Sequence, residues 1–135
     1  MSNLLELLTR VERATEPDRE LDARLECLWS GWDFERMPRD GEGSSGFFAY
    51  EKIASTAADR LVRIHDFKRY TASLDAAMVL ADRLIPPSRR RAYLDAAWCT
   101  AWYRKDVMFL TALPLEICAS VLRARLEIDA AIASC

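Results

Sequence analysis

The sequence predicts an α+β fold, in which a small antiparallel sheet carries an N-terminal helix pair, a central helix and a long C-terminal helix. Three observations support this class. Apolar residues recur at helical spacing near both ends of the chain and around residues 73–85. Two segments between them, 47–53 and 60–67, are rich in aromatic and β-branched residues, which are typical of strands. The length of 135 residues indicates a single domain, 1–135.

The composition predicts a soluble cytoplasmic protein. Hydrophobic residues make up 51% of the chain and charged residues 30%, which is ordinary for a globular domain. No apolar run approaches the roughly 18 residues that a membrane helix requires, so we expect no membrane partner. The four cysteines have no metal-binding spacing and the chain has a single histidine, so we expect neither a metal site nor a cofactor.

The first thirty residues predict two helices. Ser2 can cap the first helix, and Pro17 interrupts the pattern because proline disfavours helix at the residue before it. The second helix continues to about Gly31. The apolar residues at helical spacing are Leu4, Leu7, Leu8, Val11, Leu21, Leu25 and Leu28.

Residues 31–46 are predicted to form one long loop. Within this loop, GEGSSG at 41–46 has the letters of the GxGxxG dinucleotide fingerprint. The fingerprint needs a strand before it and a helix opening at its end, so that a pyrophosphate meets the helix N-terminus. Here a strand-like aromatic segment follows instead, and we interpret 41–46 as a loop without a nucleotide-binding role.

The segments 47–53 and 60–67 are predicted to form an antiparallel pair of strands. Alternation from Leu61 to Phe67 places Arg63 and His65 on one face. We interpret His65 as a residue at a strand edge, since no serine or cysteine nucleophile stands near it in the sequence.

The segment from Ser73 to Ile85 predicts the central helix. Thr71 or Ser73 can cap it, and Asp75 stands in the first turn, where the helix dipole favours an acid. The residues expected to be buried are Leu74, Ala77, Met78 and Ala81. Because Leu74 is expected in the core, Leu74→Asp should cost several kcal/mol of stability, as polar insertions into a core do.

Residues 89–105 are ambiguous between helix and strand. Leu94, Trp98 and Trp102 recur every four residues, as in a helix, but Leu94, Ala96, Trp98, Thr100 and Trp102 also alternate as one face of a strand. The last helix is predicted to begin with Pro114 in its first turn. Its predicted core residues are Ile117, Val121, Leu122 and Leu126.

Basic and aromatic residues are concentrated in the middle of the chain. Residues 1–42 carry a net charge of −5 (six Arg against eleven acids), whereas residues 60–105 carry +6 (ten Lys or Arg against four Asp). Charge beside stacking rings at the start of a helix favours an anionic ligand such as a nucleotide. The alternative is that the hydroxyls only cap the helix and the aromatics belong to the core. The candidate ligand-binding residues are Arg63, Arg69, Tyr70, Thr71, Ser73 and Trp98.

EPDRELDARL at 16–25, YTASLDAAMVL at 70–80 and ALPLEICASVLRARL at 112–126 come in an order that is similar to the phage α/β/α sandwich domain family of small phage and prophage proteins. This resemblance implies an antiparallel sheet with helices packed on it. The chain departs from the family at 89–104, where the family has a Trp-rich strand, and at Leu113, where it has a threonine before the proline. The resemblance implies no catalytic residues.

We predict a non-enzymatic protein, since the sequence contains no recognisable nucleophile–base pair, paired carboxylates or metal set. The predicted function is that of a phage or prophage accessory protein that binds and inhibits a host defence protein, as an anti-CRISPR or another anti-defence inhibitor does. The alternative is a module that binds an anionic ligand, as a nucleotide sponge or nucleic-acid binder, through the basic and aromatic middle. Attraction between the acidic front and the basic middle also predicts a homodimer.

Overall fold

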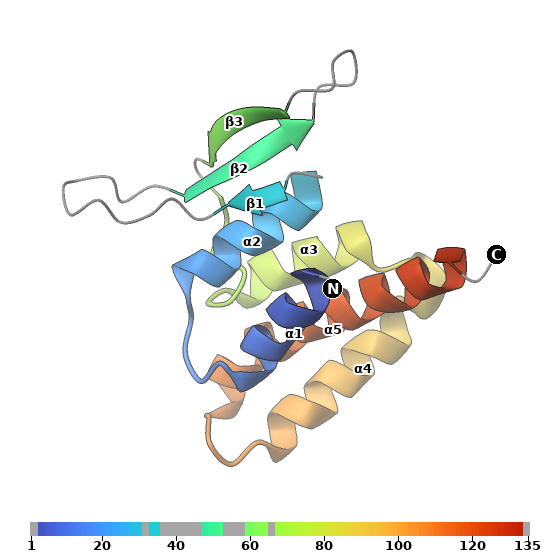
Figure 1. The fold of residues 1–135 in the computed structure, drawn as a ribbon. Coiled ribbons are helices and arrows are strands. Elements are labelled where there is room, and N and C mark those ends of the chain that lie inside the picture. Colours follow the sequence, from blue (N-terminus) through green and yellow to red (C-terminus); the bar gives the residue numbers. More distant parts are fainter. Residues whose placement is uncertain (1–2, 31–32, 36–46, 53–58, 65–66, 134–135) are drawn as a thin grey trace.

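The computed structural model describes residues 3–30, 33–35, 47–52, 59–64 and 67–133, and it gives side-chain burial for residues 4–30 and 67–133. Figure 1 shows the arrangement of the elements. In chain order they are α1 (Asn3–Arg13), α2 (Arg19–Ser30), β1 (Asp33–Glu35), β2 (Phe47–Lys52), β3 (Asp59–Ile64), α3 (Leu74–Leu84), α4 (Pro87–Tyr103) and α5 (Phe109–Ala133).

Helix α5 is the central element of the fold. Its residues 112–122 form an unbroken buried run, and the helix contacts α1, α3 and α4. Figure 1 shows α5 running between these helices, with α4 on one side and α1 and α3 on the other. A helix that is apolar on all sides must be covered on all sides, so α5 organises the other helices around itself.

The predicted α+β class, with helices packed on a sheet, is wrong. Among the residues whose burial the structure describes, the hydrophobic core is built from five helices. Every residue of the hydrophobic core found there lies on one of these helices or, for Tyr70 and Ile85, directly beside α3. Helix α5 lies at the centre of this core and contacts α1, α3 and α4, so the core is built by helix-on-helix packing.

The three strands form a separate antiparallel sheet in the order β1-β2-β3. Phe48 is opposite Arg63 and Ala49 is opposite Val62, which confirms the predicted pairing of the segments around 47–53 and 60–67. Strand β1 was not predicted, because it lies inside the segment interpreted as a loop. The sheet contacts α2 through β1 and β2, while residues 41–46 and His65 lie outside the described residues.

The helix pair at the N-terminus and the central helix are confirmed, but the buried face of α3 differs from its prediction. Ala77 and Ala81 are fully buried as expected, together with Leu80. Met78 is only partly buried, and Leu74 is 41% exposed because it stands at the first position of the helix, at the edge of the core.

The ambiguous segment 89–105 is helical through α4, which settles the choice between helix and strand. Its buried residues are Ala97 and Ala101, whereas Trp98 and Trp102 are exposed. Because the side chains of Ala97 and Ala101 are small, α4 can lie close to α5 there, and the rings of Trp98 and Trp102 lie outside this contact.

The start of the last helix was predicted too late. The backbone N–H groups of Thr111 and Ala112 donate to the carbonyl of Met108, so the first turn forms before Pro114, which lies inside α5. The predicted core residues Ile117, Val121 and Leu122 are buried, and Leu126 packs against the core.

Candidate functional site

Two residues of the predicted ligand site, Tyr70 and Thr71, are buried and bound to α2. The N–H and the Oγ1 hydroxyl of Thr71 both donate to Oδ1 of Asp22, at 2.8 and 2.7 Å. Oγ1 also accepts from the N–H of Asp18 at 2.9 Å, and Arg19 pairs with the other oxygen of Asp22 at 3.0 Å. The buried carboxylate of Asp22 therefore joins α2 to the segment that leads into α3.

Tyr70 is 1% exposed and cannot offer a stacking face to a ligand. Its hydroxyl donates to Oε1 of Glu26 on α2 at 2.7 Å. Burial, together with the hydrogen bond to Glu26, raises the pKa of Tyr70 far above its ordinary value. Tyr70 is therefore a neutral core residue at physiological pH, and with Thr71 it forms what we call the α2–α3 latch, completed by Asp22 and Glu26.

Of the other predicted ligand residues, Arg69 and Ser73 lie together before α3, where the N–H of Ser73 donates to the carbonyl of Arg69 at 2.8 Å. Ser73 caps α3 by accepting from the N–H of Ala76 at 3.3 Å, while Arg69 is exposed. The side chain of Arg63 lies outside the described side chains. Trp98 lies in the C-terminal half of α4 and contacts Phe109 at the start of α5. A ligand site built from these residues stays a prediction, and Tyr70 and Thr71 are removed from it by burial.

Trp98 belongs instead to an exposed cluster at the turn between α4 and α5. Its ring meets that of Phe109 edge to face at a centroid distance of 4.9 Å, and Trp102 meets the same ring at 5.4 Å. Large apolar side chains on either side of this contact are exposed by 54% to 79%. We call this cluster the aromatic corner and define it as Trp98, Trp102, Tyr103, Met108, Phe109 and Leu110.

Arg104, which follows Tyr103 of the aromatic corner, fixes the turn between α4 and α5 through its hydrogen bonds. Its guanidinium donates to Oε2 of Glu116 at 3.1 Å, to the carbonyl of Ala14 at 3.0 Å and to both oxygens of Asp106 at 3.0 and 2.8 Å. These contacts tie the α4–α5 turn to α5 itself and to the end of α1. The guanidinium also lowers the pKa of Asp106, through the hydrogen bonds that it donates.

Glu116 is a buried acid on the central helix, with 3% of its surface exposed. Among the described residues, its Oε1 atom has no hydrogen-bond partner. Burial raises the pKa of Glu116 above its ordinary value, against the opposing effect of Arg104. The carboxyl is therefore easier to protonate than a surface glutamate.

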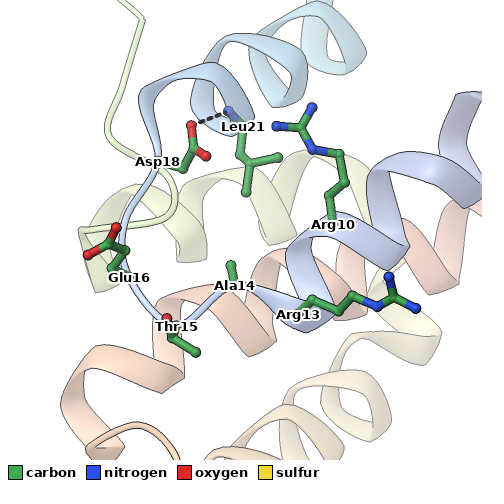
Figure 2. A pocket seen from close by; sticks show the side chains of 7 residues that line it. All are labelled: Arg10, Arg13, Ala14, Thr15, Glu16, Asp18 and Leu21. Atoms are coloured by element: carbon green, nitrogen blue, oxygen red, sulfur yellow. Dashed lines mark hydrogen bonds between the residues drawn. The ribbon is translucent and has the colours of Figure 1, made fainter.

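An open depression of about 350 Å³ lies beside the connection between α1 and α2 (Figure 2). Two of its charged residues already have partners within the chain. Arg10 pairs with Glu20 at 2.5 Å, and Oδ1 of Asp18 accepts from the N–H of Leu21 at 3.3 Å to cap α2. The depression combines both signs of charge, so it shows no preference for one ligand class. Its lining residues are Arg10, Arg13, Ala14, Thr15, Glu16, Asp18 and Leu21.

Of the aromatic corner, only Trp98 is among the predicted ligand-binding residues. Trp102 was predicted as a further stacking ring of the basic and aromatic middle, and the run from Met108 to Leu110 as part of a segment ambiguous between helix and strand. A signal was nevertheless present: helix α4 has apolar residues all round it, whereas a surface helix normally confines them to one stripe.

No group of three or more His, Cys, Asp or Glu side chains in the described part of the chain is placed to hold a metal ion. No described helix is both long and apolar enough to cross a membrane.

Comparison of the chain with protein-family models, curated proteins and solved structures gave no match. The resemblance to the phage α/β/α sandwich family therefore stays a prediction.

Proposed function

We propose that this protein acts by binding another protein through the aromatic corner, without chemistry of its own. The observation that carries the proposal is the exposure of large apolar side chains around Phe109. Trp98, Trp102 and Tyr103 are 54%, 64% and 78% exposed, and together they present roughly 400 Å². Met108 and Leu110, at 79% and 77% exposed, extend the patch beyond the few hundred Å² that is ordinary on a monomer.

The residue types of the corner support protein binding in particular. Tryptophan, tyrosine and methionine are enriched in protein–protein interfaces, and tryptophan and tyrosine dominate their energetic centres. The edge-to-face contacts with Phe109 hold Trp98 and Trp102 in place before a partner arrives. Because these rings are already ordered, little conformational entropy is lost on binding.

The partner class follows from the sequence resemblance alone. If the chain is a phage or prophage accessory protein, its partner is a host protein, and inhibition of a defence protein such as a CRISPR effector is the function that we propose. The acidic front, with a net charge of −5 over residues 1–42, suits a partner that normally binds nucleic acid through a basic surface.

Site-specific photocross-linking in a bacterial host tests the binding surface. p-Benzoylphenylalanine placed at position 108, in the corner, is expected to capture a host protein that mass spectrometry can identify. The matched control places the same group at position 132, where Ile132 is 69% exposed near the other end of α5. Equal capture at both positions, or no captured protein at position 108 other than the chain itself, would contradict the proposal.

A plating assay tests the inhibitory role. Cells that carry a defence system and express the chain are expected to lose protection against phage, and Trp98→Ala should restore it. A hot-spot ring contributes about 2 kcal/mol to binding, so the variant should weaken partner binding by at least tenfold. Ile132→Ala should behave like the wild type. Full protection of cells that express the wild-type chain, across a panel of defence systems, would contradict an anti-defence role.

A further inference from the structure

The outward side of α4 is a second exposed apolar surface, adjoining the aromatic corner. Successive helical residues are turned by about 100°, so the side opposite the buried Ala97 and Ala101 is centred on Cys99. All residues on this side are exposed. We call it the outer face of α4 and define it as Ala92, Asp95, Ala96, Cys99, Trp102 and Tyr103.

This face differs from that of an ordinary surface helix. It carries one charged residue, Asp95, and that carboxylate is already paired with Arg91 at 3.8 Å on the preceding turn. The other members are two alanines, a thiol and two large rings, and Trp102 and Tyr103 are 64% and 78% exposed. Over residues 92–103 apolar residues occur on every side of α4, but α5 covers only the Ala97 and Ala101 side.

We propose that a second copy of this chain covers the outer face, with the two α4 helices packed antiparallel about a two-fold axis at Cys99. The proposal rests on the proposed function, in which the α4–α5 region binds protein, and names one partner for it. In this arrangement, residues equally distant from Cys99 on either side meet across the interface. Trp102 of one copy meets Ala96 of the other, so a large ring faces a small residue, as in knobs-into-holes packing.

The same symmetry satisfies the polar groups of the face. Tyr103 of one copy meets Asp95 of the other, and the tyrosine hydroxyl can donate to that carboxylate. Because Arg91 already pairs with Asp95, the interface buries no unpaired charge. A two-fold interface needs a surface that is complementary to itself. The outer face is complementary in side-chain size, through Trp102 and Ala96, and in hydrogen bonding, through Tyr103 and Asp95.

The exposed rings supply a large part of the area that a dimer needs. Trp102 and Tyr103 together present roughly 300 Å², which is more than a third of the ~800 Å² that each partner buries in a stable interface. Ala92, Ala96 and Cys99, all exposed, extend this apolar surface, while Trp98, Met108 and Leu110 lie outside the outer face. The dimer would bring the two aromatic corners into one continuous surface.

Disulfide cross-linking tests whether the two-fold axis lies at Cys99, because only there do the two Cys99 thiols meet. The test uses the full chain with Cys135→Ser. In this protein Cys99 is the exposed thiol, and the other two thiols, Cys27 and Cys118, are buried. Mild oxidation with diamide should convert most of the protein to a covalent dimer through Cys99. The matched control adds Cys99→Ser and Arg89→Cys, which moves the thiol ten residues along the same helix, and it should remain uncross-linked.

Sedimentation equilibrium of the reduced protein provides the second measurement. Wild-type protein should show the mass of two chains at micromolar concentration, and Ala96→Arg should weaken the dimer at least a hundredfold with an unchanged circular dichroism spectrum. The control, Ala72→Arg, places the same charge at another exposed alanine and should stay dimeric. A wild-type monomer at 100 µM, or equal cross-linking of the Cys99 and Arg89→Cys proteins, would overturn the dimer.

The two proposals fail in different experiments. If the protein is monomeric but position 108 still captures a host protein, the dimer is wrong and the binding function stands. If the protein is dimeric through Cys99 but only its own chain is captured at position 108, the outer face is confirmed as a self-association surface and the host-binding function is wrong.

Discussion

The α2–α3 latch and the aromatic corner are opposites in their chemistry. In the latch, polar groups are buried: Asp22 and Thr71 are 1% and 0% exposed, yet each has hydrogen-bond partners inside the chain. In the corner, apolar groups are exposed, and Met108 and Leu110 are more than three-quarters accessible. The buried polar groups of the latch therefore have their hydrogen bonds within the chain, whereas the apolar side chains of the corner are left in contact with water.

This difference separates structural from functional residues without an appeal to motifs. A buried polar group with all its hydrogen bonds made is explained by stability alone. An exposed cluster of large apolar side chains carries a free-energy cost in water, and coverage by a partner removes that cost. Tyr70 and Thr71, which were predicted to bind a ligand, belong to the first kind, whereas Trp98, predicted with them, belongs to the second.

The largest effect is expected in the latch. Asp22→Ala removes the carboxylate that accepts from Thr71 and pairs with Arg19, and it leaves the buried N–H of Thr71 unpaired, which should lower the free energy of unfolding by about 3 kcal/mol. Urea denaturation measures the loss. Asp75→Ala, which removes an exposed acid in the first turn of α3, should cost less than about 1 kcal/mol. If the two variants lose equal stability, the latch is not structural.

A smaller loss of stability is expected in the corner. Trp102→Ala removes a ring that is 64% exposed and in edge-to-face contact with Phe109, a contact worth about 1 kcal/mol. The thermal unfolding midpoint should therefore fall only slightly, while self-association and partner capture are lost. A loss as large as that of Asp22→Ala would show that the corner belongs to the core, and would remove the contrast between the two regions.

The pH dependence of stability tests the buried carboxyl of Glu116, which accepts a hydrogen bond from Arg104 next to the aromatic corner. Burial raises the folded-state pKa of Glu116 above its ordinary value of 4.5. The native state therefore holds this proton more tightly than the unfolded state, and the resulting stability is present below pH 4.5 and lost as the pH rises through the raised pKa. Glu116→Gln cannot titrate and should lack this loss. Urea unfolding from pH 4 to pH 8 should give wild-type and variant curves that diverge over that interval; parallel curves would contradict the shift.

The smallest effect is expected at Leu74. The sequence predicted that Leu74→Asp would cost several kcal/mol, but the side chain is 41% exposed at the first position of α3. An acid there also suits the helix dipole, so we now expect a change within about 0.5 kcal/mol. Leu80→Ala, on the buried side of the same helix, should cost about 3 kcal/mol. Similar losses for the two variants would restore the original assignment of the buried face.

Local interactions explain what could be predicted about individual elements. The cap at Ser73 and the break at Pro17 act within a few residues of themselves, so both N-terminal helices and α3 were predicted close to their observed bounds. The paired strands β2 and β3 were predicted from their β-branched and aromatic residues. Each of these signals depends on neighbours in the sequence.

The failed predictions depended on contacts between distant residues. Thr71 meets Asp22 across 49 positions, and Arg104 meets the carbonyl of Ala14 across 90 positions. No local pattern reveals such contacts, so the latch was mistaken for a ligand site and the anchor of the corner was missed. The choice of helix for α4 likewise depended on its packing against α5, because the residues fit both periods equally well.

The sequence by itself determined where most helices begin and end, since capping, proline and apolar spacing act over single turns. Only the tertiary structure decided the fold class, because helix α5, buried over 112–122, packs against α1, α3 and α4 to form the core. Only the tertiary structure decided which aromatic rings are covered. Tyr70 became core and Trp98 became surface because burial depends on the elements that pack around a residue, and not on the residue's own neighbours in the chain.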